Sequence, residues 1–387
     1  MSLTIPGKAS GSGVMKRSSS GTPPRTGVDI VNLTNPASPT LITRISTTLF
    51  PQAHNKVHTL AVSDGFLYTT DNATEVIKIF NVSNPASPTF VASVDLNIPG
   101  SMASHEVMVQ NDRMYVASKN NSDAVNGWTH IYDVSNVGTT GPVFLKAFNT
   151  GGGTHTSMPS EDGDVLVISQ ERSNGEVRIY DISQINQPND PDPVPLLKTL
   201  TRATFGLDAH SPHHSHMHED LLFLSWYEAG LIVLNMADPA NPVWVGAFDT
   251  YTGGDNNYSG NWGAFHGLGL DKMLLSDRER GLIVVDATGV APNGDVNADG
   301  NVDGADFLAW QRGLGASPGS ATLTQGDSNR DRSVSRLDLS VVKAQFGQTS
   351  GHHHAQAVPE PSAGALLAFA ALCSGRLGPR RRRSGPR

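Results

Sequence analysis

A motif that recurs about every 50 residues constrains the fold of this 387-residue chain more than any other feature. It reads VDIVNLTNPASP from Val28 and IKIFNVSNPASP from Ile77, and later copies end with GLIVVDAT from Gly281. The six copies share an Asn or Asp after an apolar run, at Asn32, Asn81, Asp133, Asp181, Asn235 and Asp286. A period of about 50 residues made of short strands is typical of propeller blades and not of a helical solenoid.

One copy shows how a blade is built. From His58 the apolar runs TLAV, FLYTT, VIKIFNV and TFVASV are separated by the turn sequences SDG, DNATE and SNPASP. Runs of this length between Gly, Pro, Asn and Asp clusters predict four antiparallel strands. The shared Asn or Asp is expected to accept a hydrogen bond from the backbone of the turn that follows it.

The two ends of the repeat region differ from its middle. The first copy begins at its third strand and the last lacks a clear fourth strand, so the sequence predicts four complete blades and two partial ones. We expect an all-β propeller over residues 27–289 with five or six blades, an incomplete N-terminal blade, and a ring closed by pairing of the termini. Residues 1–26 lack the apolar run of a signal peptide and are predicted to be a disordered lead from a truncated or misassigned start.

Composition supports this fold and limits the partners. Glycine (39) and proline (24) are frequent, which favours many turns between short strands. The net charge of −8 argues against nucleic acid as a partner. The single cysteine, Cys373, allows no intramolecular disulfide, so folding must rest on burial of the core, to which a bound metal can add.

The repeated motif is similar to that of the LVIVD-repeat propellers, and in particular to the bacterial surface proteins called choice-of-anchor B. The last two copies, YEAGLIVLNMADPANPVWVGAFDTY and GNWGAFHGLGLDKMLLSDRERGLIVVD, resemble the final blades of that family. The resemblance covers roughly residues 28–288. It implies a propeller on a cell surface, and it implies no particular activity.

After the propeller, the segment GDVNADGNVDGADFLAWQRGLG has the spacing of a calcium-binding loop followed by a helix. Gly300 at loop position 6 permits the sharp turn. Six oxygen donors are expected, namely Asp295, Asn297, Asp299, Asn301 through its backbone carbonyl, Asp303 and Asp306.

A second loop, GDSNRDRSVSRLDLSVVKAQFG, begins 32 residues later. Arg332 replaces the turn glycine and Ser335 the acid at position 9, so this loop is expected to bind calcium more weakly. Its candidate ligands are Asp327, Asn329, Asp331, Ser333 and Asp338. Two such loops, each followed by one helix, resemble a type I dockerin over residues 293–348. The resemblance implies calcium as a cofactor and a cohesin-like or other surface protein as the partner.

The C-terminal segment carries the sequence of a sorting tail. A linker is expected over residues 349–357, followed by VPEPSA, a short apolar run from Ala363 to Cys373, and an arginine cluster within residues 358–387. The apolar run is too short to span a bilayer unaided. This tail resembles a PEP-CTERM sorting signal, which implies processing by an exosortase and a secreted or cell-surface location.

Histidines recur near the first strand of each blade, and the segment HSPHHSHMH holds five of them. In a propeller the first strand is innermost and lines the channel. His58, His105 and His213 each lie ten residues before an aromatic residue of the next strand, and His155 and His266 are offset by about two. A channel ring is therefore predicted from His58, His105, His155, His213, His214 and His266. Converging imidazoles suit a transition metal such as zinc.

Two functions remain open from the sequence. One is a non-enzymatic surface or scaffold protein in which the propeller presents a binding face and the dockerin-like module docks a partner. The other is a metal-dependent hydrolase with its site at the histidine-lined channel, acting on extracellular polysaccharide, with acids such as Glu106 nearby. The histidines also suit a purely structural role, in which they cap inner-strand backbone groups and pack in the channel. No G-x-S-x-G, phosphate-binding loop or H-E-x-x-H motif offers another chemistry.

Overall fold

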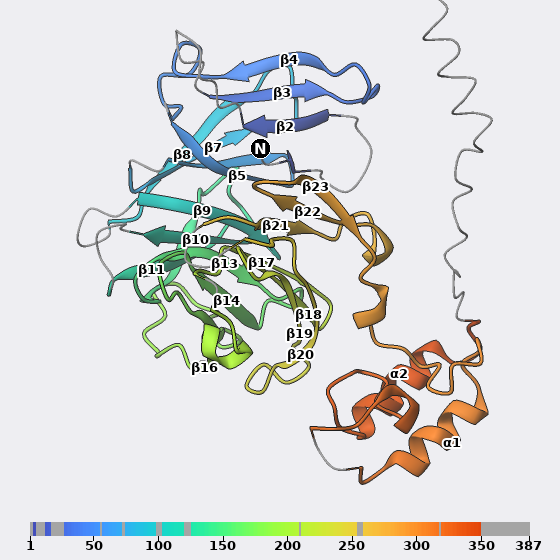
Figure 1. Ribbon diagram of the computed structural model, residues 1–387. Coiled ribbons are helices and arrows are strands. Elements are labelled where there is room, and N and C mark those ends of the chain that lie inside the picture. The colour runs from blue at the N-terminus through green and yellow to red at the C-terminus, as the bar shows by residue number, and fades with distance from the viewer. Residues whose placement is uncertain are drawn as a thin grey trace, which may run out of the picture.

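The computed structural model describes residues 27–54, 56–71, 74–97, 103–119, 125–208, 210–253, 258–316 and 319–349, together with the backbone of two short strands before residue 27. Most of the chain forms successive antiparallel sheets, and a small helical module follows them (Figure 1). The predicted linker after residue 349, the sorting tail and His352–His354 lie outside the described residues.

Six sheets follow one another in the described chain, five with four strands and one with three. The first holds β1 (Leu3–Thr4), β2 (Ser12–Lys16), β3 (Val28–Asn32) and β4 (Thr40–Ile45). The second holds β5 (Val57–Ser63), β6 (Phe66–Asp71), β7 (Val76–Asn81) and β8 (Thr89–Asp95). The third holds β9 (Ala103–Gln110), β10 (Arg113–Lys119), β11 (Gly127–Asp133) and β12 (Val143–Asn149).

The remaining sheets repeat this order. The fourth holds β13 (Thr154–Pro159), β14 (Val165–Gln170), β15 (Val177–Asp181) and β16 (Leu196–Leu200). The fifth holds β17 (His214–His218), β18 (Leu221–Trp226), β19 (Gly230–Asn235) and β20 (Val243–Phe248). The sixth holds only β21 (Asn261–Phe265), β22 (Met273–Asp277) and β23 (Gly281–Val285).

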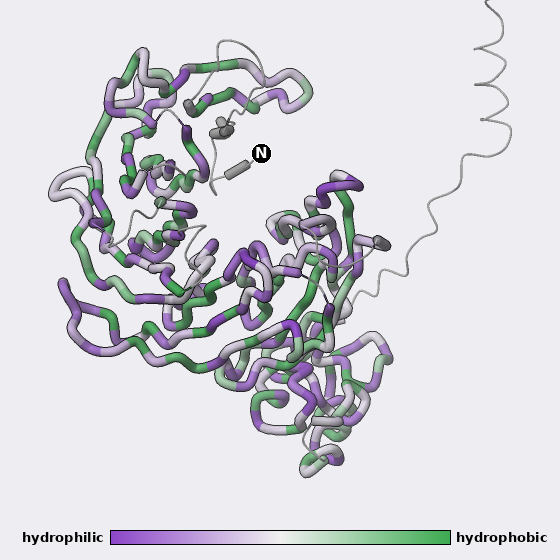
Figure 2. The backbone as a smooth tube through the Cα atoms, turned by 60° about the vertical axis from the view of Figure 1, so that its left-hand side comes forward, coloured by the Kyte–Doolittle hydropathy of each residue, from purple (hydrophilic) through white to green (hydrophobic). Residues whose placement is uncertain are grey.

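The first strands of successive sheets contact one another from β5 through β9, β13 and β17 to β21, which places them innermost. Figure 2 shows the sheets following an arc, with the first sheet at one end and the sixth at the other. The predicted propeller of four-stranded blades followed by a helical module is confirmed.

The hydrophobic core lies between the blades. Each of the five propeller clusters joins two neighbouring sheets, as where Val167 and Ile179 of the fourth sheet pack with Leu224 of the fifth. Alternating strand residues face the two neighbouring sheets, so most central strands are apolar on both faces.

The ends of the propeller differ from the sequence prediction. β1 and β2 supply two strands within residues 1–26, which were predicted to be a disordered lead, and they pair with β3. The sixth sheet lacks a fourth strand, as predicted; among the described residues its three strands pair with one another, and one isolated bridge joins Asn261 of β21 to Tyr227 beside the fifth sheet. The expected pairing of the two termini in one sheet is therefore wrong, because the N-terminal strands complete their own blade.

The shared Asn or Asp of the repeat has the predicted structural role. In all six copies a side-chain oxygen of this residue accepts a hydrogen bond from the backbone N–H two residues later, over 2.8–3.0 Å. This bond fixes the turn that leads into the outermost strand, or into η3 after the last copy.

The helical module contains α1 (Gly304–Gly313) and α2 (Arg336–Gln345). Asp303 and Ser335 cap their N-termini, each accepting a backbone hydrogen bond through its side chain. Trp310, Ala321 and Val334 form its small core. Short 3₁₀ helices complete the described structure: η1 (Arg202–Phe205), η2 (Leu270–Lys272), η3 (Thr288–Val290) and η4 (Leu323–Gln325). No helix in the described part is long and apolar enough to cross a membrane.

Candidate functional sites in the channel and the calcium loops

A recurring β-bulge brings four histidines together at one end of the inner strands. The pairing of β5, β9 and β13 with their neighbours shifts register at His58, His105 and His155. His213 lies just before β17, where its backbone N–H bonds Ser225, the residue opposite His214. A bulged residue leaves the ladder and its side chain can turn toward the channel.

These four histidines form a continuous column of rings. Ring centroids are 4.2 Å apart between His58 and His105, 4.1 Å between His105 and His155, and 4.2 Å between His155 and His213. The column continues to Trp262, which stacks on His213 at 4.9 Å and occupies the bulge of β21. Trp262 thus takes the position in the sixth sheet that histidine takes in the others.

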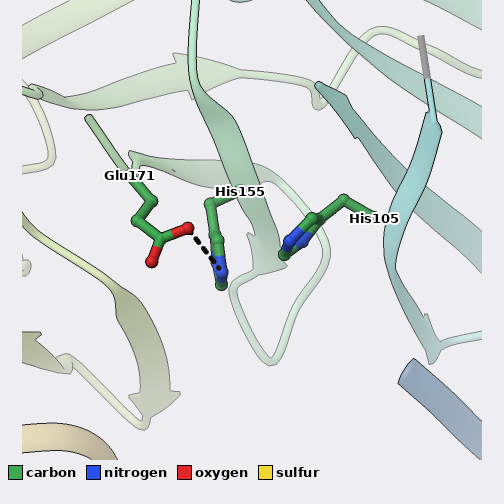
Figure 3. A group of neighbouring side chains, drawn as sticks. All are labelled: His105, His155 and Glu171. Atoms are coloured by element: carbon green, nitrogen blue, oxygen red, sulfur yellow. Dashed lines mark ion pairs between the residues drawn. The ribbon is translucent and has the colours of Figure 1, made fainter. Parts of the chain in front are cut away.

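Glu171, directly after β14, lies beside this column. Lys119 Nζ lies 2.5 Å from its Oε2, and the Tyr227 hydroxyl donates to its Oε1 over 2.6 Å. His155 Nε2 is 3.5 Å from Oε2 and His213 Nε2 is 3.9 Å from Oε1. Figure 3 shows His155 between Glu171 and His105. The carboxylate is held by residues from three different blades.

Burial sets the charge state of this cluster. It lowers the pKa of His155 well below the usual range, and the neighbouring His105 and His213 lower it further. Burial also lowers the pKa of His213 to about 3, against the opposing charge of Glu171. Burial alone would raise the pKa of Glu171, but the charges of Lys119 and His213 and two hydrogen bonds lower it. At neutral pH the site therefore combines neutral imidazoles with an ionised carboxylate.

The remaining predicted ring members lie apart from the column. His214 Nε2 pairs with Glu106 Oε1 at 2.6 Å. Burial alone would lower the pKa of His214, but the charge and hydrogen bond of Glu106 outweigh it and raise the pKa. His266 follows β21 at the end opposite Trp262 and stacks on His218 at 4.6 Å. Counting back from the second strand misplaced His266, because η2 lies between β21 and β22.

Sequence reasoning missed Glu171, Lys119 and Tyr227. A signal was available, because the second strand of each blade from the second onward ends next to the bulge. The residues at or directly after these strand ends are Asp71, Lys119, Glu171, Tyr227 and Asp277. The repeat therefore predicts polar groups beside the histidine column, at the end of the second strand of each blade.

The first calcium loop is organised by hydrogen bonds from its own backbone. Asp295 accepts from the N–H groups of Asp299 and Gly300 at 3.0 and 2.9 Å. Asp306 accepts from Val296 and Asn297 at 2.9 and 3.2 Å and also from Asp303. Asp295 and Asp306 are fully buried. Of the other predicted ligands, Asn301 and Asp303 lie on the same loop, and Asp303 also caps α1.

The second loop repeats this arrangement 32 residues later. Asp327 accepts from Arg332 N–H at 3.0 Å, and Asp338 accepts from Asn329 and Ser335 at 3.1 and 2.7 Å. Asn329 and Ser333 bond to Asp331 as their counterparts bond to Asp299. The two loops share one backbone framework.

The oxygens of the second loop suit a hard cation. Carboxylate oxygens of Asp327, Asp331 and Asp338 lie within 4.8 Å of one another. Asp327 Oδ1 is buried without a hydrogen-bond partner. Burial, together with the charges of Asp338 and Asp331, raises the pKa of Asp327 to about 6. A buried, oxygen-only set of acids is the donor set that calcium prefers.

The second loop also contacts the propeller. The side-chain amide of Asn235, at the end of β19, donates to the backbone oxygen of Asn329. Arg332 Nη2 donates to the backbone oxygen of Trp244 in β20 over 3.0 Å, and Arg330 Nε to that of Ala291 over 2.8 Å. The helical module is thus joined to the fifth sheet through this loop.

Comparison with known families agrees with the two-part organisation. Residues 293–347 match the dockerin type I domain, and residues 55–96 match the LVIVD repeat. The LVIVD match covers all four strands of the second sheet, and the dockerin match covers both calcium loops and both helices. No curated protein sequence matches the chain.

Solved structures share the propeller fold at low identity. A periplasmic gluconolactonase of Pseudomonas aeruginosa superposes with a TM-score of 0.52 at 12% identity, covering 72% of this chain and 78% of that one. A candidate 6-phosphogluconolactonase of Bacteroides fragilis superposes with a TM-score of 0.50 at 12% identity, covering 72% and 80%. At this identity the likeness shows the fold alone.

Proposed function

We propose that this chain is an exported β-propeller scaffold that is attached to a protein partner through its calcium-loaded dockerin-like module. The observation that carries the proposal is the duplication of the calcium loop, in which two carboxylates accept hydrogen bonds from equivalent backbone N–H groups in both copies. Such a framework holds the carboxylates together before calcium arrives, so that binding orders the two helices and the partner surface they carry.

The exposed faces of the two helices support a docking role. Phe307 and Leu308 of α1 and Leu337 of α2 are among the exposed large apolar residues. Apolar side chains in a small, otherwise polar module are what a protein partner can bury. A cohesin-like module is the partner that fits a dockerin match.

The place of attachment belongs to the same proposal. The repeats resemble those of choice-of-anchor B surface proteins, and residues 358–387 resemble a PEP-CTERM tail. Processing of that tail by an exosortase would retain the protein at the cell surface or in the extracellular matrix, where the propeller presents a binding face. An extracellular polysaccharide is the ligand class that this location favours.

The test is binding of the full chain to a recombinant type I cohesin with calcium and with excess EGTA. We expect removal of calcium by EGTA, or removal of its carboxylate ligands in Asp295→Ala combined with Asp327→Ala, to weaken binding at least about a hundredfold. His105→Ala, in the channel, should leave binding unchanged. Equal binding in EGTA, or no binding by the calcium-loaded chain, would overturn the proposal.

A second candidate function is metal-dependent hydrolysis in the channel, and the clustering of His105, His155 and Glu171 favours it. A metal-bound water could attack a polysaccharide or ester substrate there. Its test is the release of new reducing ends or carboxylates by the wild-type chain and by His155→Ala. Equal rates in the wild-type chain and His155→Ala would rule out hydrolysis at this site, and the docking proposal would be unaffected.

A further inference from the structure

We propose that the propeller channel binds one divalent transition-metal ion through His105, His155 and Glu171, with His213 as a fourth group beside it. The inference is independent of the docking function and of any hydrolysis, because it concerns binding alone. One ring nitrogen from each histidine and one carboxylate oxygen lie within 4.8 Å of one another. Bonds of about 2.1 Å to a shared ion require only a small inward closure of this set.

The two histidines of this site are almost completely buried. His105 and His155 are 3% and 5% exposed. The Nδ1 atoms of both rings are buried without a hydrogen-bond partner. A buried polar nitrogen without a partner costs free energy, whereas coordination to a metal or an ordered water satisfies it. Both histidines also sit on bulges, which leave the strand ladder in order to place them here.

The protonation pattern favours a cation between the rings and Glu171. His213 Nδ1 lies 2.5 Å from the backbone oxygen of Trp262, so this nitrogen carries the proton and donates it. His213 Nε2 then presents a lone pair toward Glu171 Oε1, 3.9 Å away. A lone pair and a carboxylate repel each other unless a cation lies near both. A backbone acceptor on the far nitrogen is also the usual support of a metal-binding imidazole.

Lys119 and Tyr227 orient Glu171. Each contacts a different carboxylate oxygen, which leaves further lone pairs of both oxygens for a metal. Tyr227 holds its hydroxyl on Glu171 from a backbone with a positive φ of 24°. The Lys119 charge opposes a cation, so it should limit the metal affinity.

The ligand types select the metal class. Two imidazoles and one carboxylate suit zinc or ferrous iron, whereas calcium and magnesium prefer oxygen alone. Three protein ligands leave coordination positions for water or a small ligand. The channel site and the calcium loops should therefore fill independently when both metals are present.

The test is titration of the metal-stripped full chain with zinc by calorimetry, in saturating calcium so that the loops are filled. We expect one channel site that His155→Gln or Glu171→Gln weakens at least about a hundredfold. Lys119→Met should bind zinc several-fold more tightly, because it removes a like charge and keeps the carboxylate. A purely structural Lys119–Glu171 pair predicts no gain.

Controls separate the channel from the other histidines. His218→Gln and the triple change of His352, His353 and His354 to alanine should leave the channel affinity unchanged. Should the Glu171 or His155 variants misfold, X-ray absorption of the zinc-loaded wild-type chain remains decisive, with two imidazoles expected in the coordination shell. Zinc binding equal in wild type and Glu171→Gln, no site tighter than about 10 μM, or a shell without imidazole would overturn the inference.

Discussion

The calcium loops and the channel cluster are both buried sets of polar groups, but they are assembled in different ways. Within a loop, position 1 and position 12 are Asp295 and Asp306, and the backbone between them supplies their hydrogen bonds. In the channel, His105, His155 and Glu171 come from two blades, and Tyr227 from a third. The loops are therefore organised by local sequence, whereas the cluster exists only once the blades have packed.

The two regions also differ in how their buried groups respond to protonation. The loops gather carboxylates whose repulsion a cation relieves, as the raised pKa of Asp327 indicates. The propeller gathers neutral histidines that resist protonation, as the lowered pKa values of His105, His155 and His130 indicate. The same change of pH should therefore act on the two regions in opposite directions.

The largest expected effect is on stability: with metals removed by EDTA, the propeller and the helical module should respond to pH in opposite directions. Burial lowers the pKa of His130 to about 4, so the unfolded propeller takes up a proton first as pH falls below about 6.5. Propeller stability should fall by roughly 3 kcal/mol between about pH 6.5 and 4 from this residue alone. Asp327, with its pKa raised to about 6, should make the calcium-free module less stable as pH rises from about 4 to 6.

Thermal unfolding from pH 4 to 7.5 measures how the stability of each region changes with pH. The unfolding transition of the helical module is identified as the one that shifts when calcium is added. His130→Gln should flatten the propeller slope, and Asp327→Asn the module slope. Two unfolding transitions that shift in the same direction with pH would contradict the expected difference between the propeller and the helical module.

An intermediate effect is expected at the contact between the regions. Asn235 is 2% exposed, its Oδ1 fixes the repeat turn, and its amide donates to Asn329. Asn235→Asp keeps the turn acceptor, as Asp133 and Asp181 show in other blades, but loses the donor. Loss of the hydrogen bond to Asn329 should lower the free energy of unfolding by about 1–3 kcal/mol. It should also weaken calcium binding at the second loop about tenfold.

The matched control is Asn81→Asp, at the same repeat position in the second blade, where the turn bond to Ser83 is the same. Calorimetric calcium titration should show no change in this control. Equal loss in both variants would mean that the substitution disturbs the turn and not the contact with the module.

The smallest expected effect concerns the turn of the second loop. Arg332 has φ of 63°, where its counterpart Gly300 has 92°. A left-handed conformation costs a non-glycine residue about 1 kcal/mol, so Arg332→Gly should tighten calcium binding at this loop about fivefold. Arg332→Lys loses the contact with Trp244 but keeps the strain, and should not gain affinity. If Arg332→Lys also bound calcium more tightly, the gain would come from loss of the contact with Trp244 and not from relief of backbone strain.

Local signals made much of the molecule predictable from its sequence. The repeat, its Asn and Asp turns and both calcium loops are encoded within stretches shorter than one blade. The column of His58, His105, His155 and His213 was also predictable, because the repeat relates the four positions. Glu171 was not, because its role depends on Lys119 and Tyr227 from neighbouring blades. β1 and β2 were missed because their short, polar sequences lack strand periodicity.

Hydrogen exchange of the full chain, with and without calcium at constant zinc, tests the two-part account most directly. We expect calcium to increase protection across residues 293–347 and at the contact around Asn235, and to leave the protection of β9 and β13 unchanged. Protection that spreads through the inner strands, or a helical module equally protected without calcium, would contradict it.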